Sequence, residues 1–168
     1  MSHRIKVAAL AVALVALVGC TATHGAPQRP VASVTSAAPD CRASDVVAQL
    51  LGGRGNPTPA TTPGRVPSGF VPAAAVECSS AGGAQAVVER RMSGDLAALV
   101  TTLDRPSDRA ADVCPAMGQI QPVLYLVDAQ GRTVRVAWPL DRCGYVQQRA
   151  SDAVAALHVD SEQTLAVG

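Results

Sequence analysis

The amino-acid sequence predicts a two-layer α+β domain, in which helices cover one face of a mostly antiparallel sheet made of two hairpins. Two pairs of strand-like segments, in residues 75–92 and 123–136, carry this prediction, and a helical pattern follows each pair. Only one Phe, two Tyr and one Trp occur in the 168 residues, so Val, Leu and Ala must fill the core. Such a core is thin, and two disulfides would compensate for it.

A short helix is expected at residues 44–51. Ser44 is a residue type that favours helix starts, the apolar side chains recur at helical spacing, and Gly52 and Gly53 end the pattern. Residues 52–69 are rich in Gly, Pro and Thr, which interrupt regular structure. We therefore expect a long surface loop after this helix.

The first hairpin is expected next. Residues 75–78 and 86–92 are strand-like, and turn-forming residues separate them. The second of these segments contains Glu89, Arg90 and Arg91. We interpret the three charged side chains as a solvated face near the end of the strand.

The helix after this hairpin has the clearest periodicity. Ser93 can cap its N-terminus, Asp95 lies in its first turn, where the helix dipole favours an acidic side chain, and Pro106 ends it. Apolar residues at spacing i, i+3, i+4 and i+7 predict one buried stripe, which consists of Leu96, Leu99, Val100 and Leu103.

The second hairpin has a fully apolar first strand. Residues 123–127 are all apolar, as expected for a central strand that is covered on both faces. Residues 128–131 predict a turn that ends in glycine, and residues 133–136 alternate and pair back. Residues 149–157 predict a last helix, with room for a terminal strand near residues 163–167.

Four cysteines beyond Cys20 form an even set: Cys41, Cys78, Cys114 and Cys143. An even set indicates two disulfides where the chain is exported, as its first residues predict. Three pairings are open, and we favour Cys41–Cys78 with Cys114–Cys143, because each bond then ties neighbouring segments into one structural unit. No CxxC pair occurs, which argues against a zinc site and against a redox-active dithiol. We expect neither a metal nor a cofactor.

The first residues of the chain have the pattern of an export signal. Arg4 and Lys6 precede an apolar run over residues 7–18, and small Gly19 follows it. As a helix, this run would span about 18 Å, which is short of the roughly 30 Å hydrocarbon core of a bilayer. The run Leu17-Val18-Gly19-Cys20 resembles a bacterial lipobox.

The resemblance to a lipobox implies cleavage before Cys20, diacylglycerol on its sulfur, and anchoring on the outer face of the cytoplasmic membrane. Residues 1–19 would then be a lipoprotein signal peptide. Residues 20–40, rich in Thr, Ser, Ala and Pro without a hydrophobic period, predict a flexible tether. Residues 41–168 would form the disulfide-linked domain. An ordinary secretory signal with an incidental cysteine is the alternative.

No motif for nucleophilic catalysis occurs in the predicted domain. His158 is its only histidine and is expected at the end of the last helix. Ser151, Asp152 and Asp160 lie near it in the sequence, but no known triad motif joins them. Lys6 is the only lysine, so the mature chain has none for covalent catalysis.

A few other residues are weaker candidates for a site. Asp104, Asp108 and Asp112 have a spacing of four, which suits one helix face rather than a calcium-binding loop. A glycosidase-type pair of carboxylates stays open among 13 acidic residues, although aromatic stacking platforms are few. Trp138 either ends the second hairpin exposed or lies in the core against a Cys114–Cys143 bond.

Charge and composition narrow the classes of function. With 14 basic and 13 acidic residues and no basic patch, nucleic acid is not expected as a partner. Residues 66–72, 76–78 and 143–144 resemble segments of small secreted actinobacterial domains to which no activity is attached. We interpret the chain as a lipid-anchored extracytoplasmic module that binds or supports something in the cell envelope without catalysis. A small envelope hydrolase using a carboxylate pair and a sensing partner of a membrane complex are the alternatives.

Overall fold

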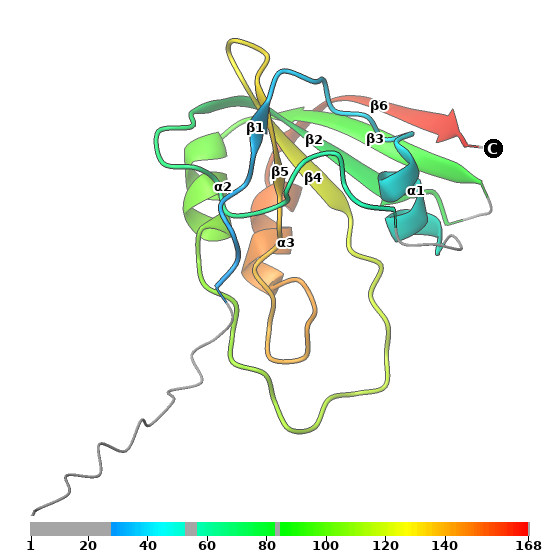
Figure 1. Ribbon diagram of the computed structural model, residues 1–168, viewed down its shortest axis with the longest axis vertical. Helices are drawn as coiled ribbons and strands as arrows, with labels where there is room; N and C mark the ends of the chain where they lie inside the picture. The colour runs from blue at the N-terminus through cyan, green and yellow to red at the C-terminus, as the bar shows by residue number, and fades with distance from the viewer. Residues whose placement is uncertain (1–27, 53–56, 83–84, 168) are drawn as a thin grey trace, which may run out of the picture.

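The computed structural model describes residues 28–52, 57–82 and 85–167. In chain order the elements are β1 (Val34–Thr35), α1 (Ser44–Leu51), β2 (Pro72–Ser80), β3 (Ala86–Ser93), α2 (Leu96–Leu103), β4 (Val123–Asp128), β5 (Thr133–Val136), α3 (Gln148–Ala155) and β6 (His158–Ala166). The predicted succession of helix, hairpin, helix, hairpin and helix is confirmed, with one further strand at each end (Figure 1). Within these ranges no helix combines the length and apolarity of a transmembrane span. The predicted signal peptide and Cys20 lie outside them.

The strands form one six-stranded sheet in the order β1-β5-β4-β2-β3-β6, and every neighbouring pair is antiparallel. The two predicted hairpins are β2–β3 and β4–β5, and they join through β2 and β4 in the middle of the sheet. The expectation of a central β4 is confirmed, since Val123, Leu124 and Leu126 are at most 2% exposed.

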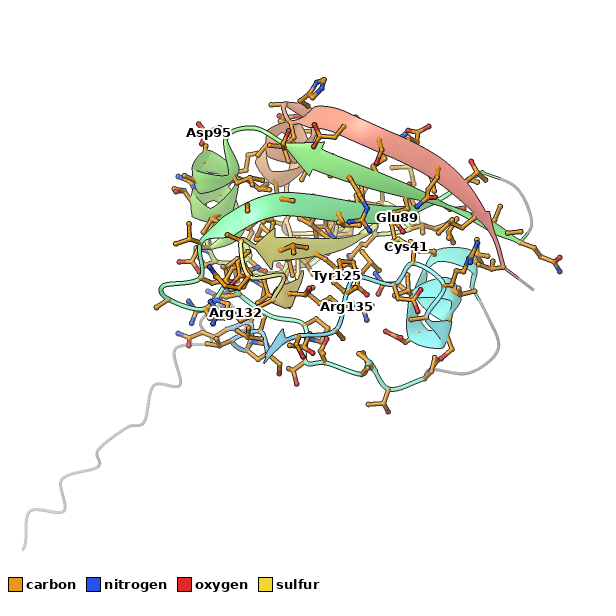
Figure 2. All side chains as sticks on the ribbon, turned by 90° about the horizontal axis from the view of Figure 1, so that it is seen from above. Cys41, Glu89, Asp95, Tyr125, Arg132 and Arg135 are labelled. Atoms are coloured by element: carbon orange, nitrogen blue, oxygen red, sulfur yellow. A yellow bond between two sulfur atoms is a disulfide. The ribbon has the colours of Figure 1, made fainter. Side chains whose placement is uncertain are left out.

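Helices pack on both faces of the sheet, so the prediction that they share one face is wrong. Successive side chains of a strand point to opposite faces. Ala75 and Leu124 pack in one apolar cluster with α2 and α3, whereas their chain neighbours Val76 and Tyr125 pack in a second cluster with α1. Figure 2 shows Tyr125 and Arg135 on the side of the sheet that faces α1. Because the central strands are apolar on both faces, each face needs its own cover.

The predicted tether is too long at its C-terminal end, because residues 28–40 belong to the fold. β1 pairs with β5, and Ala32 is only 5% exposed. The backbone here packs so closely on Gly64 that a Cβ at that position would lie 2.4 Å from Pro30 O and from Ala32 N. Backbone hydrogen bonds hold this segment in place. Because such bonds do not depend on the side chains, the sequence of the segment shows no hydrophobic period. Residues 20–27 lie outside the described ranges.

α2 confirms the predicted buried stripe. Leu96, Leu99 and Leu103 are buried, and Val100 packs against them partly exposed. The residue that caps the helix differs from the prediction. Asp95 is the N-cap and accepts a hydrogen bond from Ala98 N at 2.9 Å, so Ser93, the last residue of β3, is not the cap. An Asp in this position satisfies a backbone N–H of the first turn.

Glu89 and His158 lie in surroundings other than those predicted, because β6 is longer than expected. It pairs with β3 from Ser93 back to Ala86, so β3 becomes an interior strand. Glu89 is therefore buried at 6% exposure rather than solvated, with the Arg91 guanidinium 3.0 Å from its carboxylate. His158 is the first residue of β6 and does not end the last helix.

Two disulfides, Cys41–Cys78 and Cys114–Cys143, confirm the favoured pairing, with a Cα–Cα distance of 5.5 Å in each. The first bond joins the segment before α1 to β2. The second joins the long segment between α2 and β4 to the loop before α3. The bonds link residues 37 and 29 positions apart, and chain-entropy estimates give roughly 3.5 kcal/mol of stabilisation for each.

Candidate functional site

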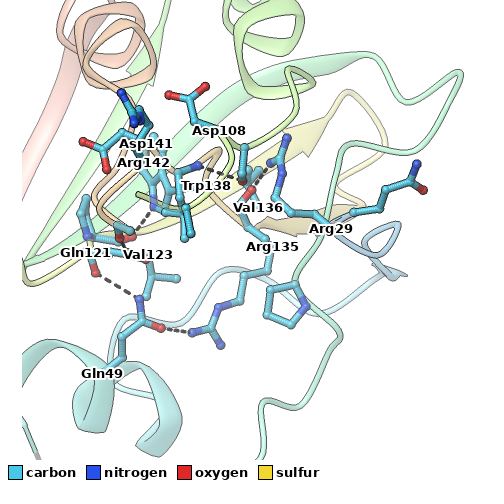
Figure 3. Close-up of a pocket in the computed structure, with 18 residues that line it drawn as sticks. Arg29, Gln49, Asp108, Gln121, Val123, Arg135, Val136, Trp138, Asp141 and Arg142 are labelled. Carbon is cyan, nitrogen blue, oxygen red and sulfur yellow. Dashed lines mark hydrogen bonds between the residues drawn. The ribbon is translucent and has the colours of Figure 1, made fainter. Parts of the chain in front are cut away.

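A cavity of about 440 Å³ lies at the end of the sheet where β4 begins and β5 ends. Its walls come from residues 28–29, from parts of 107–123 and from parts of 135–144, together with Gln49 of α1 and Pro63. The surface that the walls present to the cavity is mostly apolar, although half of the lining residues are polar or charged (Figure 3). This composition is typical of a small-molecule site.

Trp138 forms a wall of this cavity. Its side chain is 6% exposed, and the indole Nε1 donates a hydrogen bond to Pro122 O at 2.6 Å. The bond ties the chain after β5 to the residue that precedes β4. Of the two interpretations of Trp138, the exposed one is wrong. Its place in the core is confirmed, whereas its packing against the Cys114–Cys143 bond stays a prediction.

A chain of polar contacts holds the wall nearest α1. Arg135 forms a buried ion pair with Asp45, and its guanidinium donates to Gln49 Oε1 at 2.9 Å. Gln49 Nε2 then donates to the backbone oxygen of Gln121, and Gln121 Nε2 donates to that of Gly144, both at 3.1 Å. These contacts connect α1, β5 and two loops, so this wall is fixed before any ligand binds (Figure 3).

Arg29 fixes the wall on another side. Its guanidinium donates to Leu103 O at 2.7 Å and also to the carbonyl oxygens of Arg105 and Ala137. Burial lowers the pKa of Arg29, and the nearby Asp104 carboxylate opposes this shift. The carbonyl groups at the C-terminal end of a helix favour a cation. The contact therefore holds the start of the described chain against the end of α2.

Asp108 and Asp141 are the carboxylates that a hydrolase would have to pair in this cavity. Asp141 accepts hydrogen bonds from the backbone N–H groups of Cys143 at 2.8 Å and Tyr145 at 3.0 Å. Asp108 accepts one from Gln147 Nε2 at 3.2 Å. These contacts are typical of carboxylates that shape a loop rather than of a catalytic acid and base.

A second cavity, of about 300 Å³, lies on the other side of Trp138 and Pro122. Glu77 borders it, with Arg90 at 3.5 Å, and Arg90 also binds Glu162 at 2.6 Å. Burial raises the pKa of Glu77, and the Arg90 ion pair opposes the shift. Among the described residues that line this cavity there is neither a second carboxylate nor a histidine, so Glu77 has no catalytic partner there.

The residues considered for nucleophilic catalysis do not assemble into a triad. His158 Nε2 lies 3.8 Å from Asp160 Oδ1, and Ser93 Oγ donates to the same oxygen at 2.8 Å. In a serine-nucleophile site the histidine lies between hydroxyl and carboxylate, whereas here the carboxylate lies between the other two. Ser151 lies apart from them, in α3 beside the second cavity.

The three aspartates with a spacing of four do not share a helix face. α2 ends at Leu103, Asp104 is its C-cap, and Asp108 and Asp112 lie in irregular chain beyond it. Over the described ranges, no group of three His, Cys, Asp or Glu side chains could hold a metal ion.

The sequence predicts little of the cavity wall. The position of Arg135 could have been inferred, because this residue alternates with apolar neighbours in a short strand. Asp45 and Gln49 also follow a recognisable pattern, since their spacing of four places both on one face of a helix. Arg29 and Gln121 follow no such pattern, because they come from segments without periodicity.

Comparisons with known proteins add no relatives. No family model matches the chain, and neither a curated protein nor a solved structure matches it. Function is therefore argued from the geometry of the cavity.

Proposed function

We propose that the chain is a lipid-anchored extracytoplasmic protein that binds an apolar small molecule in the cavity beside Trp138, without catalysis. The observation that carries this proposal is the mostly apolar, preformed cavity of about 440 Å³. Ligand sites commonly enclose roughly 300–1,000 Å³. Because hydrogen bonds already hold the walls, binding would cost little ordering of the protein.

Export and anchoring are parts of the same proposal. The apolar run that ends in Gly19 and Cys20 supports them. Two disulfides give further support, because such bonds persist outside the reducing cytoplasm. On this proposal the acylated Cys20 holds the domain at the outer face of the cytoplasmic membrane.

Binding is favoured over catalysis because four charged side chains at the cavity are engaged in structural contacts. Arg29 and Arg135 hold backbone oxygens and helix side chains, and Asp108 and Asp141 accept hydrogen bonds from neighbouring loops.

Energy transfer tests the cavity. Trp138 is the only tryptophan and lines the cavity, so it is the energy donor for dye that binds there. We expect energy transfer from Trp138 to anilinonaphthalene sulfonate, an apolar anionic dye, when the full chain is titrated with it. Ala110→Phe, which places a large side chain at the cavity, should abolish the transfer. Ala116→Phe, in an exposed position of the same segment away from the cavity, should leave it intact.

Dye dissolved in lipid or detergent contributes equally to the energy transfer of both variants, so this contribution cancels when the two values are subtracted. Equal energy transfer in Ala110→Phe and Ala116→Phe would place the dye outside the cavity and contradict the proposed binding site.

Cys20→Ala tests the anchor. Two acyl chains hold a protein firmly, since each buried CH₂ contributes ~0.8 kcal/mol, so the variant should be released from the membrane or remain uncut. Fractionation and mass spectrometry of the N-terminus measure both outcomes. A variant that is processed normally and stays with the membrane would contradict the anchor.

A further inference from the structure

The segment between α2 and β4 carries an exposed apolar tip, defined here as Val113, Met117 and Ile120. These side chains are 86%, 69% and 60% exposed. Residues 113–122 contain no charged side chain. Several large apolar side chains that folding leaves exposed within one short segment indicate an interaction surface, whereas single ones are ordinary.

The backbone of the tip is fixed although it has no helix or strand. Cys114 is bonded to Cys143, and the Tyr145 hydroxyl donates to Met117 O at 2.6 Å. Gln119 Oε1 accepts a backbone N–H hydrogen bond at 2.8 Å. The apolar side chains are therefore held outward by the fold, and the carbonyl of Met117 is already satisfied. A backbone with satisfied polar groups can approach an apolar phase at lower cost.

The described chain begins beside this segment. Gln28 lines the same cavity as Ala110 and Gln121, which flank the tip on either side. Figure 1 shows the start of the described chain and this segment at the same end of the molecule. Cys20 is eight positions before Gln28. A chain of that length reaches at most about 28 Å.

We propose that the tip inserts into the interfacial region of the lipid bilayer that holds the acyl chains of Cys20. The proposal rests on the lipid anchor of the proposed function. The short reach from Cys20 keeps this end of the domain at the bilayer, and the tip is apolar and uncharged there. Its side chains would leave water for the headgroup and acyl boundary, as the apolar face of an interfacial helix does.

A bilayer also accounts for the position of the nearest charges. Arg109 and Asp112 precede the tip, and Arg142 lies on the adjoining loop, where its carbonyl accepts a hydrogen bond from Ala111 N at 2.8 Å. Charged residues that border an apolar tip can stay in the headgroup layer while the tip inserts.

Depth-dependent quenching tests this insertion in the full acylated chain. Ile120→Trp is reconstituted into vesicles of phosphatidylethanolamine and phosphatidylglycerol, with and without bromine on the acyl chains. We expect brominated lipid to quench the added indole emission, after subtraction of the Trp138 signal, and the emission to be blue-shifted. Met117→Trp is a second probe of the same tip.

Val71→Trp is the matched control. Val71 is 76% exposed, and it adjoins Pro72, which pairs with Asp128 at the far end of β4 from the tip. The indole at this position should keep its emission in brominated vesicles.

The outcomes separate the insertion from the anchor. Flotation with the vesicles and no quenching in either tip variant would overturn the insertion and leave the anchor intact. Quenching equal to that of Val71→Trp would overturn it too. The blue shift could instead depend on the amount of protein per vesicle and not on the bromine content of the lipid. That result would place another protein on the tip and would also overturn the insertion. A chain that fails to float would overturn the anchor and the insertion that rests on it.

Discussion

Asp128 is a buried carboxylate whose charge stabilises the turn between β4 and β5. It ends β4, is 5% exposed, and accepts hydrogen bonds from the backbone N–H groups of Gln130 at 3.0 Å and Arg132 at 2.8 Å. Arg132 Nε adds an ion pair at 2.7 Å. Burial alone would raise the pKa of Asp128, but the hydrogen bonds from Arg132 and Gln130 outweigh it, and the pKa falls below the ordinary 3.8.

Asp128→Asn should therefore lower the melting temperature at neutral pH. A carboxyl group with a depressed folded-state pKa contributes stability that is fully present above its unfolded pKa of 3.8 and is lost as pH falls through the folded value. The difference in melting temperature between the protein and the variant should thus shrink on acidification below pH 3.8. Thermal denaturation followed by circular dichroism measures it.

The matched control is Asp112→Asn, in an exposed position of irregular chain, which should leave the melting temperature unchanged. If the difference in melting temperature between the protein and Asp128→Asn stayed the same in acid, the charge of Asp128 would not be the cause of that difference.

At the scale of elements, the two disulfides differ in their access to solvent. Cys41 and Cys78 are 1% and 0% exposed and belong to the cluster under α1. Cys114 is exposed in the segment that carries the tip, and Cys143 is half-buried in the adjoining loop. Thiol–disulfide exchange requires a thiolate to reach a sulfur atom, so the surface bond is the vulnerable one.

Graded reduction of the folded protein should open Cys114–Cys143 first and leave Cys41–Cys78 intact. Alkylation followed by peptide mass spectrometry measures the order. Loss of the surface bond removes roughly 3.5 kcal/mol of chain-entropy stabilisation and frees the segment that closes the cavity. Energy transfer from Trp138 to the dye should fall as that bond opens.

The double variant Cys114→Ser with Cys143→Ser serves as the control, since it should show the same reduced energy transfer without any reductant. Simultaneous opening of both bonds at every reductant concentration would contradict the difference in access.

For the whole molecule, local patterns predict the elements but not how they are layered. The strands at residues 123–127 and 133–136 carry strong apolar patterns, and the four cysteines pair as their spacing favours. The patterns do not say that α1 covers the opposite face, because an amphipathic helix fits either side of a sheet that is apolar on both. The full length of β6 is hidden too, since an exposed edge strand has little apolar alternation.

The candidate site is less predictable because loops and long-range contacts build it. Trp138 is conspicuous as the only tryptophan, but only its burial in the folded chain decides between its two interpretations. Arg29 joins the site through three backbone carbonyl groups far along the chain. Contacts with backbone oxygens depend on the fold and leave no signature in residue type or spacing.

The bond between Cys41 and Cys78 also determines how the domain bears a mechanical load. A pull on the N-terminal end first meets Arg29, then the backbone hydrogen bonds that join residues 30–33 to residues 62–65, and then the two residues of β1 on β5. Beyond them the tension reaches Cys41 and passes covalently into Cys78 of β2, in the middle of the sheet. α1 itself lies off this load path, so stretching would detach the first strand and leave the helix and its buried ion pair unloaded.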